Sequence, residues 1–176
     1  MSERTETIVI FSDVHGRADR VRELVSRHRD ATTFVFLGDG LRDVDESLFS
    51  ARGAALICVR GNCDAFSSGT PEEALLDLGG IRLLLMHGHR ASVKSGLDRA
   101  LAYASARGAD ALLFGHTHLP EERYFSEGEE LLDGTRLSRP MWAFNPGSLG
   151  EPRGGKPSYG LLQIRNGQML FSHGTL

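Results

Sequence analysis

The sequence predicts an α/β protein with a parallel sheet in its first third and a β-rich remainder. Short apolar runs alternate with amphipathic helical patterns over residues 7–59, which is typical of strands joined by helices. The remainder carries two hairpin signals, Gly79-Gly80 and Asn166-Gly167, each between strand candidates. Of the 176 residues, 40% are hydrophobic and 24% are charged, so the chain can build a core without disulfide staples.

The first three strands are expected at residues 7–11, 33–37 and 54–59, which are almost continuously apolar. Apolar residues between these runs recur at helical spacing and predict two helices. Their stripes are Val21, Leu24, Val25 and His28 in the first helix, and Leu41, Val44, Leu48 and Ala51 in the second. Apolar strands joined by helices indicate a parallel sheet that is covered on both faces.

The middle and the end of the chain predict shorter strands and one more helix. The helix has the apolar stripe Val93, Leu97, Ala100, Leu101 and Ala104. The strands are expected at 74–78, 81–86, 111–114, 123–125, 141–144, 159–164 and 169–172. No linker, repeat or low-complexity segment divides the sequence, so we expect one domain over residues 1–176.

Charge and composition exclude several classes of function. The 20 basic and 23 acidic residues give a net charge of -3, and no basic, aromatic-rich stretch favours long nucleic acid. No apolar run approaches the roughly 20 residues of a membrane span, and residues 1–11 do not resemble a secretory leader. With two cysteines only, Cys58 and Cys63, we expect a cytoplasmic protein in a reducing compartment.

Polar side chains of metal-binding types follow five of the predicted strands. Open α/β sheets place their ligand sites at the carboxyl ends of strands, so these side chains should meet at one edge. They are Asp13 and His15, then Asp39, then Asn62, Cys63 and Asp64, then His87 and His89, and finally His116 and His118. This succession of carboxylates, imidazoles and an amide indicates a metal site.

Each cluster alone has a simpler explanation. Asp13 and His15 could be a turn and cap pair, and Asp39 could cap a helix. The pair His116 and His118 is more informative, because residues i and i+2 of an extended segment point the same way and can bind one centre or two adjacent centres. A structural role for all five clusters together is the weaker explanation.

The ordered motifs Asp13-x-His15, Gly38-Asp39, Gly61-Asn62-Cys63-Asp64, His87-Gly88-His89 and Gly115-His116-Thr117-His118 resemble those of the calcineurin-like metallophosphoesterase superfamily. Gly-Asn-Cys-Asp and the later Asn145-Pro146-Gly147-Ser148 are closest to its small bacterial and archaeal phosphodiesterase branch. The resemblance implies a four-layer α/β/β/α sandwich of two mixed sheets flanked by helices.

The same resemblance implies two divalent transition-metal ions. One would be held by Asp13, His15, Asp39 and His118, and the other by Asp39 as a bridge with Asn62, His87 and His116. Such a pair can share a hydroxide and stabilise an in-line displacement at phosphorus. Oxygen and imidazole ligands favour manganese, with nickel, zinc, iron and cobalt as alternatives.

Four residues are candidate catalytic residues: Asn62, Cys63, Asp64 and His89. Cys63 stands where relatives commonly hold a histidine acid, so it is either a weak proton donor or a packing residue. Asp64 is expected to orient a ligand or the Asn62 loop. His89 is expected near the substrate or the ligands.

The function that these features predict is metal-dependent hydrolysis of a small phosphodiester or nucleotide. Substrate choice is expected to lie in the loops at residues 66–71 and 147–157, which carry no motif. The alternative is a catalytically silent protein-binding scaffold like a retromer subunit, because fold alone does not fix function. No membrane and no long nucleic acid is expected as a partner, and a homo-oligomer is left open.

Overall fold

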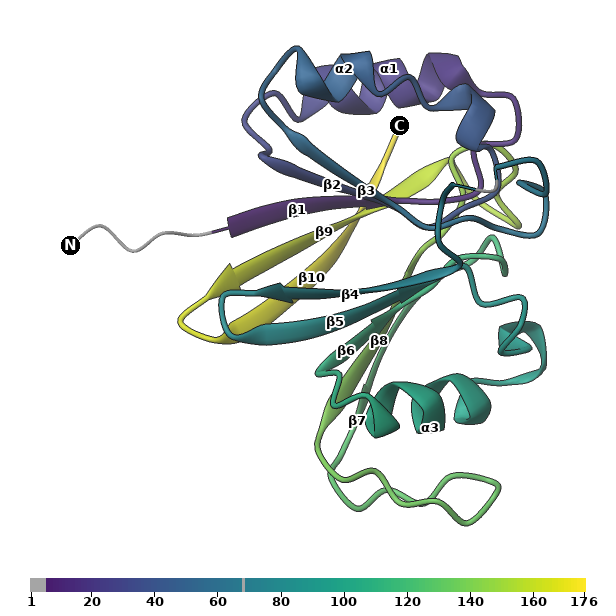
Figure 1. Ribbon diagram of the computed structural model, residues 1–176, viewed down its shortest axis with the longest axis vertical. Helices are drawn as coiled ribbons and strands as arrows, with labels where there is room; N and C mark the ends of the chain where they lie inside the picture. Colours follow the sequence, from purple (N-terminus) through teal and green to yellow (C-terminus); the bar gives the residue numbers. More distant parts are fainter. Residues whose placement is uncertain (1–5, 68) are drawn as a thin grey trace.

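A five-stranded mixed sheet combines the N-terminal third of the chain with its C-terminal hairpin (Figure 1). The computed structural model describes residues 6–67 and 69–176. Strands β1, β2 and β3 run parallel, and β9 pairs antiparallel with β1. In sheet order the strands are β10 (Gln168–Thr175), β9 (Ser158–Arg165), β1 (Glu6–Phe11), β2 (Thr33–Phe36) and β3 (Ala55–Cys58).

The second sheet also has five strands and is mixed. Strands β5, β6 and β8 run parallel, while β4 and β7 pair antiparallel at its two edges. In sheet order the strands are β4 (Glu73–Leu78), β5 (Ile81–Met86), β6 (Ala111–Leu113), β8 (Met141–Pro146) and β7 (Pro120–Phe125).

The two sheets pack face to face and each carries helices on its outer face (Figure 1). Helices α1 (Ala18–Arg27) and α2 (Ser47–Ser50) cover the first sheet through a cluster that includes Phe11, Phe36 and Phe49. Helix α3 (Asp98–Ala106) covers the second sheet through Leu101 and its neighbours. The predicted α/β/β/α sandwich is therefore confirmed.

The predicted apolar strands bury the side chains that face the space between the two sheets. Side chains from both sheets form one cluster there, including Ile10 and Val35 from the first sheet and Leu85 and Leu113 from the second, all with no exposed surface. Removing this apolar area from water is the main stabilising contribution to such a core. It also fixes the two sheets so that their strand ends lie side by side.

The prediction of a continuous helix along the apolar stripe from Leu41 to Ala51 is wrong. The structure has a 3-10 turn at Leu41–Asp43, an extended Val44 and then the four-residue α2. The Leu41 N–H donates to the Asp64 carboxylate, and the Ser47 N–H donates to Asp45 Oδ1. The first bond satisfies an N–H that has no acceptor within a helix, whereas the second diverts the Ser47 N–H from a helical carbonyl, beyond the extended Val44 where the helix is interrupted.

The third predicted helix is shorter than its apolar stripe. A 3-10 turn at Val93–Ser95 precedes Gly96, whose φ of 135° is incompatible with a helix, and α3 begins at Asp98. The stripe from Val93 to Ala104 is nevertheless buried against the second sheet, as its spacing predicts. In the described part of the chain, no helix has the length and apolar character that a bilayer span requires.

Candidate metal centre

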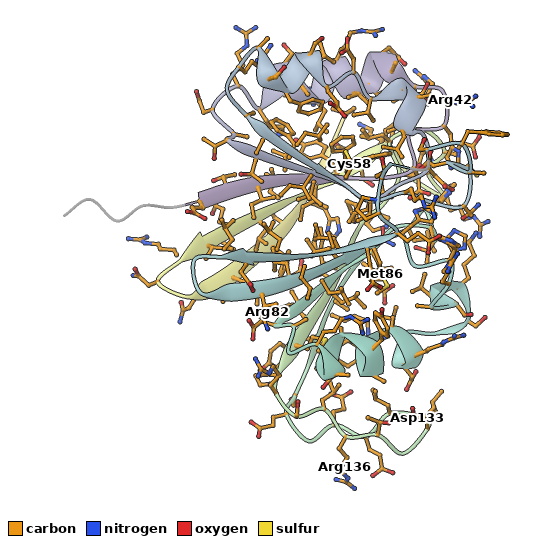
Figure 2. The ribbon with its side chains drawn as sticks, in the orientation of Figure 1. Arg42, Cys58, Arg82, Met86, Asp133 and Arg136 are labelled. Atoms are coloured by element: carbon orange, nitrogen blue, oxygen red, sulfur yellow. The ribbon has the colours of Figure 1, made fainter. Side chains whose placement is uncertain are left out.

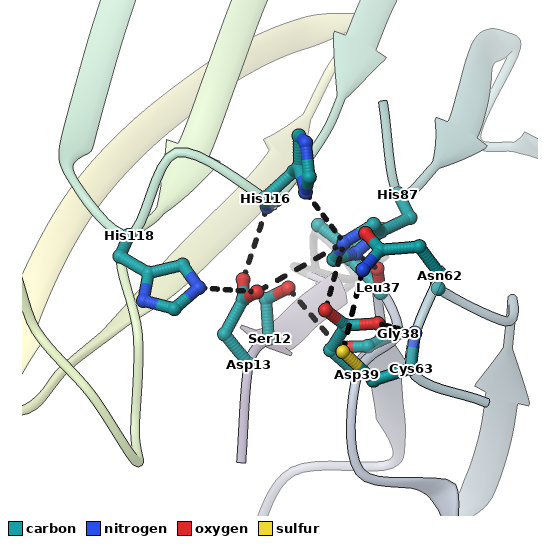
Figure 3. Close-up of polar contacts among 12 residues, drawn as sticks. Ser12, Asp13, Leu37, Gly38, Asp39, Asn62, Cys63, His87, His116 and His118 are labelled. Carbon is teal, nitrogen blue, oxygen red and sulfur yellow. Dashed lines mark hydrogen bonds and ion pairs between the residues drawn. The ribbon is translucent and has the colours of Figure 1, made fainter. Parts of the chain in front are cut away.

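Five loops bring the predicted polar clusters together at one end of the two sheets. The loops follow β1, β2 and β3 in the first sheet and β5 and β6 in the second. Figure 3 shows side chains from all five loops pointing toward one another. The prediction that these residues meet at the carboxyl ends of the strands is therefore confirmed, although the loops come from two sheets and not from one.

The first group of side chains is Asp13, His15 and His118, whose ligand atoms lie within 4.8 Å of one another. His118 Nε2 is 3.1 Å from Asp13 Oδ1 and 3.4 Å from His15 Nε2. The carbonyl of Glu151 lies 2.7 Å from His118 Nδ1 and can only accept, so Nδ1 carries the proton. The lone pair of His118 Nε2 is thereby aimed at Asp13.

The second group is Asp39, His87 and His116, again within 4.8 Å. His87 Nε2 is 3.3 Å from Asp39 Oδ2 and 3.1 Å from His116 Nδ1. His87 is fully buried, and its Nδ1 donates to the Leu37 carbonyl over 2.8 Å. As with His118, a backbone acceptor fixes the tautomer and leaves the other ring nitrogen for a ligand.

Asp39 lies between the two groups. Its Oδ1 accepts the Cys63 N–H over 2.7 Å, and its Oδ2 is 3.3 Å from His87 Nε2 and 3.9 Å from His15 Nε2. One carboxylate thus faces an imidazole from each group. A carboxylate in this position can contact two cations at once.

Several of these residues hold unusual backbone conformations. Asp13, His15, Asp39, His116 and His118 all have positive φ, between 42° and 69°. They are five of the seven non-glycine residues with positive φ in the described ranges. Such conformations cost energy and collect at functional sites, so the surrounding fold imposes them. They also correct one expectation, because His116 and His118 do not lie in an extended segment, and they face different groups.

Two glycines permit the close approach of the loops. A Cβ added at Gly61 would lie 2.0 Å from Asp39 Oδ1, and one at Gly115 would lie 2.1 Å from Ser12 Oγ and 2.9 Å from Asp13 Oδ2. No larger residue fits at either place without moving a candidate ligand. The glycines of these motifs are therefore needed for packing around the site.

The two buried carboxylates control protonation at the centre. Asp13 raises the pKa of His15, and burial would lower the pKa of His87, but Asp39 and Asp13 outweigh burial and raise it, so a metal ion would have to displace protons from these rings. Burial would raise the pKa of Asp39, but the hydrogen bond and charge of His87 outweigh burial and lower that pKa to about 2. Burial would also raise the pKa of Asp13, but the imidazoles of His118, His15 and His87 around it outweigh burial and hold that pKa well below its usual range. Burial and the charge of His87 lower the pKa of His116 to about 4. Two carboxylates are thus ionised while His116 is neutral.

The donor set also fits a cation, because carboxylate oxygens and imidazole nitrogens converge at close range. Asp13 Oδ1 is buried and accepts no hydrogen bond from the described residues. Ring nitrogens approach one another at 3.1 Å and 3.4 Å between pairs of histidines. Carboxylate oxygens and ring nitrogens that converge in this way are ligands that a bound cation could take up.

Cys63, Asn62 and Asp64 lie along one side of the centre. Cys63 forms a third group with His15 and Asp39, and the Asn62 side-chain amide donates to Cys63 Sγ over 3.3 Å. Burial and then Asp39 raise the pKa of the Cys63 thiol to about 11, so it is protonated. Asp64 is buried, and its carboxylate accepts hydrogen bonds from the backbone N–H groups of Asp39, Gly40, Leu41 and Gly61.

His89 lies beyond the second group, beside a separate hollow. Its ring centroid is 5.6 Å from that of His87 and 6.2 Å from that of His116. It lines a hollow of about 410 Å3 with Glu72, Arg90 and Tyr103 among its neighbours. His89 is therefore placed next to the candidate ligands rather than among them.

Some residues that shape the site carry no sequence signal. The carbonyls of Leu37 and Glu151 orient two imidazoles, yet a backbone carbonyl is present at every position. Asn145 and Ser148 do belong to a motif. The Asn145 amide donates to the Gly115 carbonyl and to Thr117 Oγ1, and Ser148 Oγ donates to the Asp13 carbonyl. Asn145 thus holds the loop after β6 within the second sheet, and Ser148 ties the chain after β8 to the loop after β1 of the first sheet.

Fold and site together define a metal-binding hydrolase built on two packed mixed sheets. A family model described as a calcineurin-like phosphoesterase superfamily domain matches residues 7–167. The chain belongs to the calcineurin-like phosphoesterase superfamily, and it is a metallophosphoesterase, as the sequence motifs predicted. The family implies divalent metal ions, and the groups described above are its candidate ligands.

The similar proteins agree with this assignment. The chain is 31% identical to the probable metallophosphoesterase YsnB of Bacillus subtilis (strain 168), over 90% of this chain and 85% of that protein. It is also 31% identical to the phosphodiesterase YfcE of Escherichia coli (strain K12), over 88% and 86%.

Solved structures resemble the whole chain. A structure from Streptococcus pneumoniae TIGR4, described as a predicted phosphoesterase, has a TM-score of 0.76 and 26% identity, covering 99% of this chain and 91% of that one. Vacuolar Protein Sorting 29 from Cryptosporidium parvum has a TM-score of 0.66 and 16% identity, covering 98% of each chain. At this low identity the second likeness shows the fold alone.

Proposed function

We propose that the chain is a metal-dependent phosphodiesterase that hydrolyses a small phosphodiester or nucleotide at a centre of two metal ions. The position of Asp39 carries the proposal, because its Oδ2 faces His87 from one group and His15 from the other. A single-metal site would need only one of the two groups. A mixed set of carboxylates and imidazoles suits manganese, nickel, zinc, iron or cobalt better than calcium, and manganese is the metal that we propose.

The ligand assignment follows the two groups. Asp13, His15 and His118 would hold one ion, and His87 and His116 would hold the other, with Asp39 shared between them. Asn62, at the rim beside Cys63, would complete the second ion's ligands with its amide oxygen. Two cations held by these two groups would acidify a water molecule and neutralise negative charge on the phosphate of the substrate.

Other residues of the chain would orient the metal ligands and contact the substrate. The carbonyls of Leu37 and Glu151 hold the rings of His87 and His118 with one nitrogen toward the centre. Asp64 holds the loop that carries Asp39. His89, beside the hollow of about 410 Å3, would contact the substrate or support the ligands.

Cys63 would favour diesters with good leaving groups. Its thiol is protonated and has a pKa of about 11, so it can donate a hydrogen bond to a departing oxygen but is a poor acid. It also adds no positive charge beside a dianionic monoester, as an imidazolium would. Weak hydrolysis of ordinary monoesters is therefore expected.

A metal-supplemented activity screen tests the proposal. The purified protein is freed of metal with a chelator, reloaded with manganese, nickel, zinc, iron or cobalt, and assayed on diesters, monoesters and cyclic nucleotides. We expect diester hydrolysis that requires added metal and saturates at two equivalents. His118→Ala is the matched inactive control. Absence of hydrolysis with every metal, in a folded protein that binds them, would favour the scaffold alternative.

A further inference from the structure

An aromatic side chain stands exposed beside the candidate metal centre. Phe66 is 85% exposed and lies in the loop that follows β3, two residues after the buried Asp64. Such a ring gains almost nothing from burial in the fold, so both its edge and a face are open to a ligand at the candidate metal centre. The fold anchors its loop, because the Ser67 N–H donates to the Asp64 carbonyl over 2.9 Å.

The ring borders a hollow that opens directly onto the centre. The hollow has a volume of about 280 Å3, near the lower end of ligand pockets, and is lined by Phe66, Arg42, His15 and Cys63 among others. His15 and Cys63 belong to the candidate ligand groups. A molecule with its phosphate on the metal ions could therefore extend into this hollow and reach the ring.

Arg42 supports the ring from one side. Its guanidinium carbon is 5.3 Å from the centroid of the Phe66 ring, within the range of a cation–π contact. Figure 2 shows Arg42 at the end of the molecule near the loops of the first sheet. Within residues 6–67 and 69–176, no carboxylate forms an ion pair with it, whereas the nearby Arg17 is bound by Asp19. Arg42 is thus available to hold the ring and to attract an anion.

The hollow beside His89 offers no comparable surface. Its aromatic residue, Tyr103, has the guanidinium of Arg107 3.4 Å from its ring centroid, and its hydroxyl donates to the Glu73 carboxylate. Both hollows are lined by two carboxylates, Glu72 and Glu73 here and Asp43 and Asp64 beside Phe66, so the exposure of the aromatic ring is what distinguishes them. A nucleobase can therefore stack on the exposed ring of Phe66 more readily than on the ring of Tyr103.

We propose that Phe66, supported by Arg42, binds the base of a nucleoside carried by the phosphoester substrate. The inference rests on the proposed function and names its substrate class. Every base has a π-face, so stacking on one ring selects nucleosides without selecting a sequence. Phe66 contacts the base, and Arg42 is a positioning residue that holds the opposite face of the ring.

Binding of two matched ligands tests this inference without turnover. Calorimetry with the manganese-loaded protein compares adenosine 5′-monophosphate with ribose 5-phosphate, which differ by the base. Stacking of one base predicts roughly tenfold tighter binding of the nucleotide. Phe66→Ala should bring the two affinities within about twofold, and Phe66→Trp should keep the difference.

Three further variants complete the test: one is a control away from the site, and two change Arg42. Leu132→Ala removes a side chain that is 92% exposed next to Asp133, at the opposite end of the molecule in Figure 2, and should change neither affinity. Arg42→Ala should reduce the difference between the ligands, and Arg42→Lys should restore part of it. The inference is wrong if the wild-type difference is below threefold, or if Phe66→Ala leaves it unchanged.

A separate assay distinguishes this inference from the proposed function. Hydrolysis of ethyl p-nitrophenyl phosphate by the wild-type protein tests phosphodiesterase activity and does not require a nucleoside. If hydrolysis fails while the nucleotide preference depends on Phe66, the proposed function is wrong and the binding surface stands. If hydrolysis occurs without that preference, the substrate class named here is wrong.

Discussion

Replacing Asp64 with asparagine should destabilise the loop that carries Asp39, although the two side chains have the same shape. Asp64 is only 6% exposed, and each of its oxygens accepts two backbone N–H groups. Oδ2 accepts from Asp39 at 2.8 Å and Gly61 at 2.9 Å, and Oδ1 accepts from Gly40 and Leu41 at 2.9 Å. In Asp64→Asn an amide nitrogen must face one of these pairs.

The loss can be worked from these four bonds. Whichever way the amide turns, two N–H groups lose their acceptor, and hydrogen bonds to a charged group contribute about 1.5–3 kcal/mol each. The expected loss is therefore about 3–6 kcal/mol in the free energy of unfolding. For a domain of this size that corresponds to a fall of roughly 6–24 °C in Tm.

Urea unfolding in the presence of a chelator measures this loss without the contribution of bound metal. Asp43→Asn is the matched control, because Asp43 Oδ2 accepts only the Gly16 N–H and an asparagine oxygen can replace it. We expect the control to lose less than about 1 kcal/mol. If Asp64→Asn unfolds within 1 kcal/mol of Asp43→Asn at an unchanged m-value, Asp64 does not hold the loops together as argued.

Three further predictions concern the centre itself. Asp39→Asn should abolish most diester hydrolysis and lower occupancy at both metal positions, measured together by metal analysis and activity; two retained metals with full activity would contradict a shared carboxylate. His116→Ala and His118→Ala should each remove a different step of a metal titration, and loss of the same step would indicate one metal ion. Cys63→His should flatten the dependence of rate on leaving-group pKa and raise monoester relative to diester hydrolysis, because an imidazolium adds an acid and a charge; parallel slopes over a series of aryl esters would make Cys63 a packing residue.

Much of the fold could be predicted because its signals are local. The apolar runs that became β1, β2 and β5 and the stripe of α1 follow periods that the chain carries by itself. The candidate ligands could also be selected, since polar residues after parallel strands reach one edge. Their roles stay predictions, while their convergence is a feature of the structure.

Other features depended on contacts between distant residues. The C-terminal hairpin was expected, but its place beside β1 in the first sheet was not, because the register Val9 to Leu161 is decided by packing across the core. The start of the helix expected from Leu41 to Ala51 is held by the distant Asp64, whose carboxylate accepts the Gly40 and Leu41 N–H groups, and the chain leaves the helical path at the extended Val44. Local periodicity contains no information about such an acceptor.

The sequence by itself determined which residues are available for metal chemistry and which strands carry them. The motif resemblance assigned them to two ions, but only the tertiary structure brings the members of each group together, because His15 and His118 are 103 positions apart and face each other at 3.4 Å. It also decided the positive φ of Asp13, Asp39 and His116. Those conformations are unfavourable for an isolated segment, so only the packing of two sheets against each other can hold them.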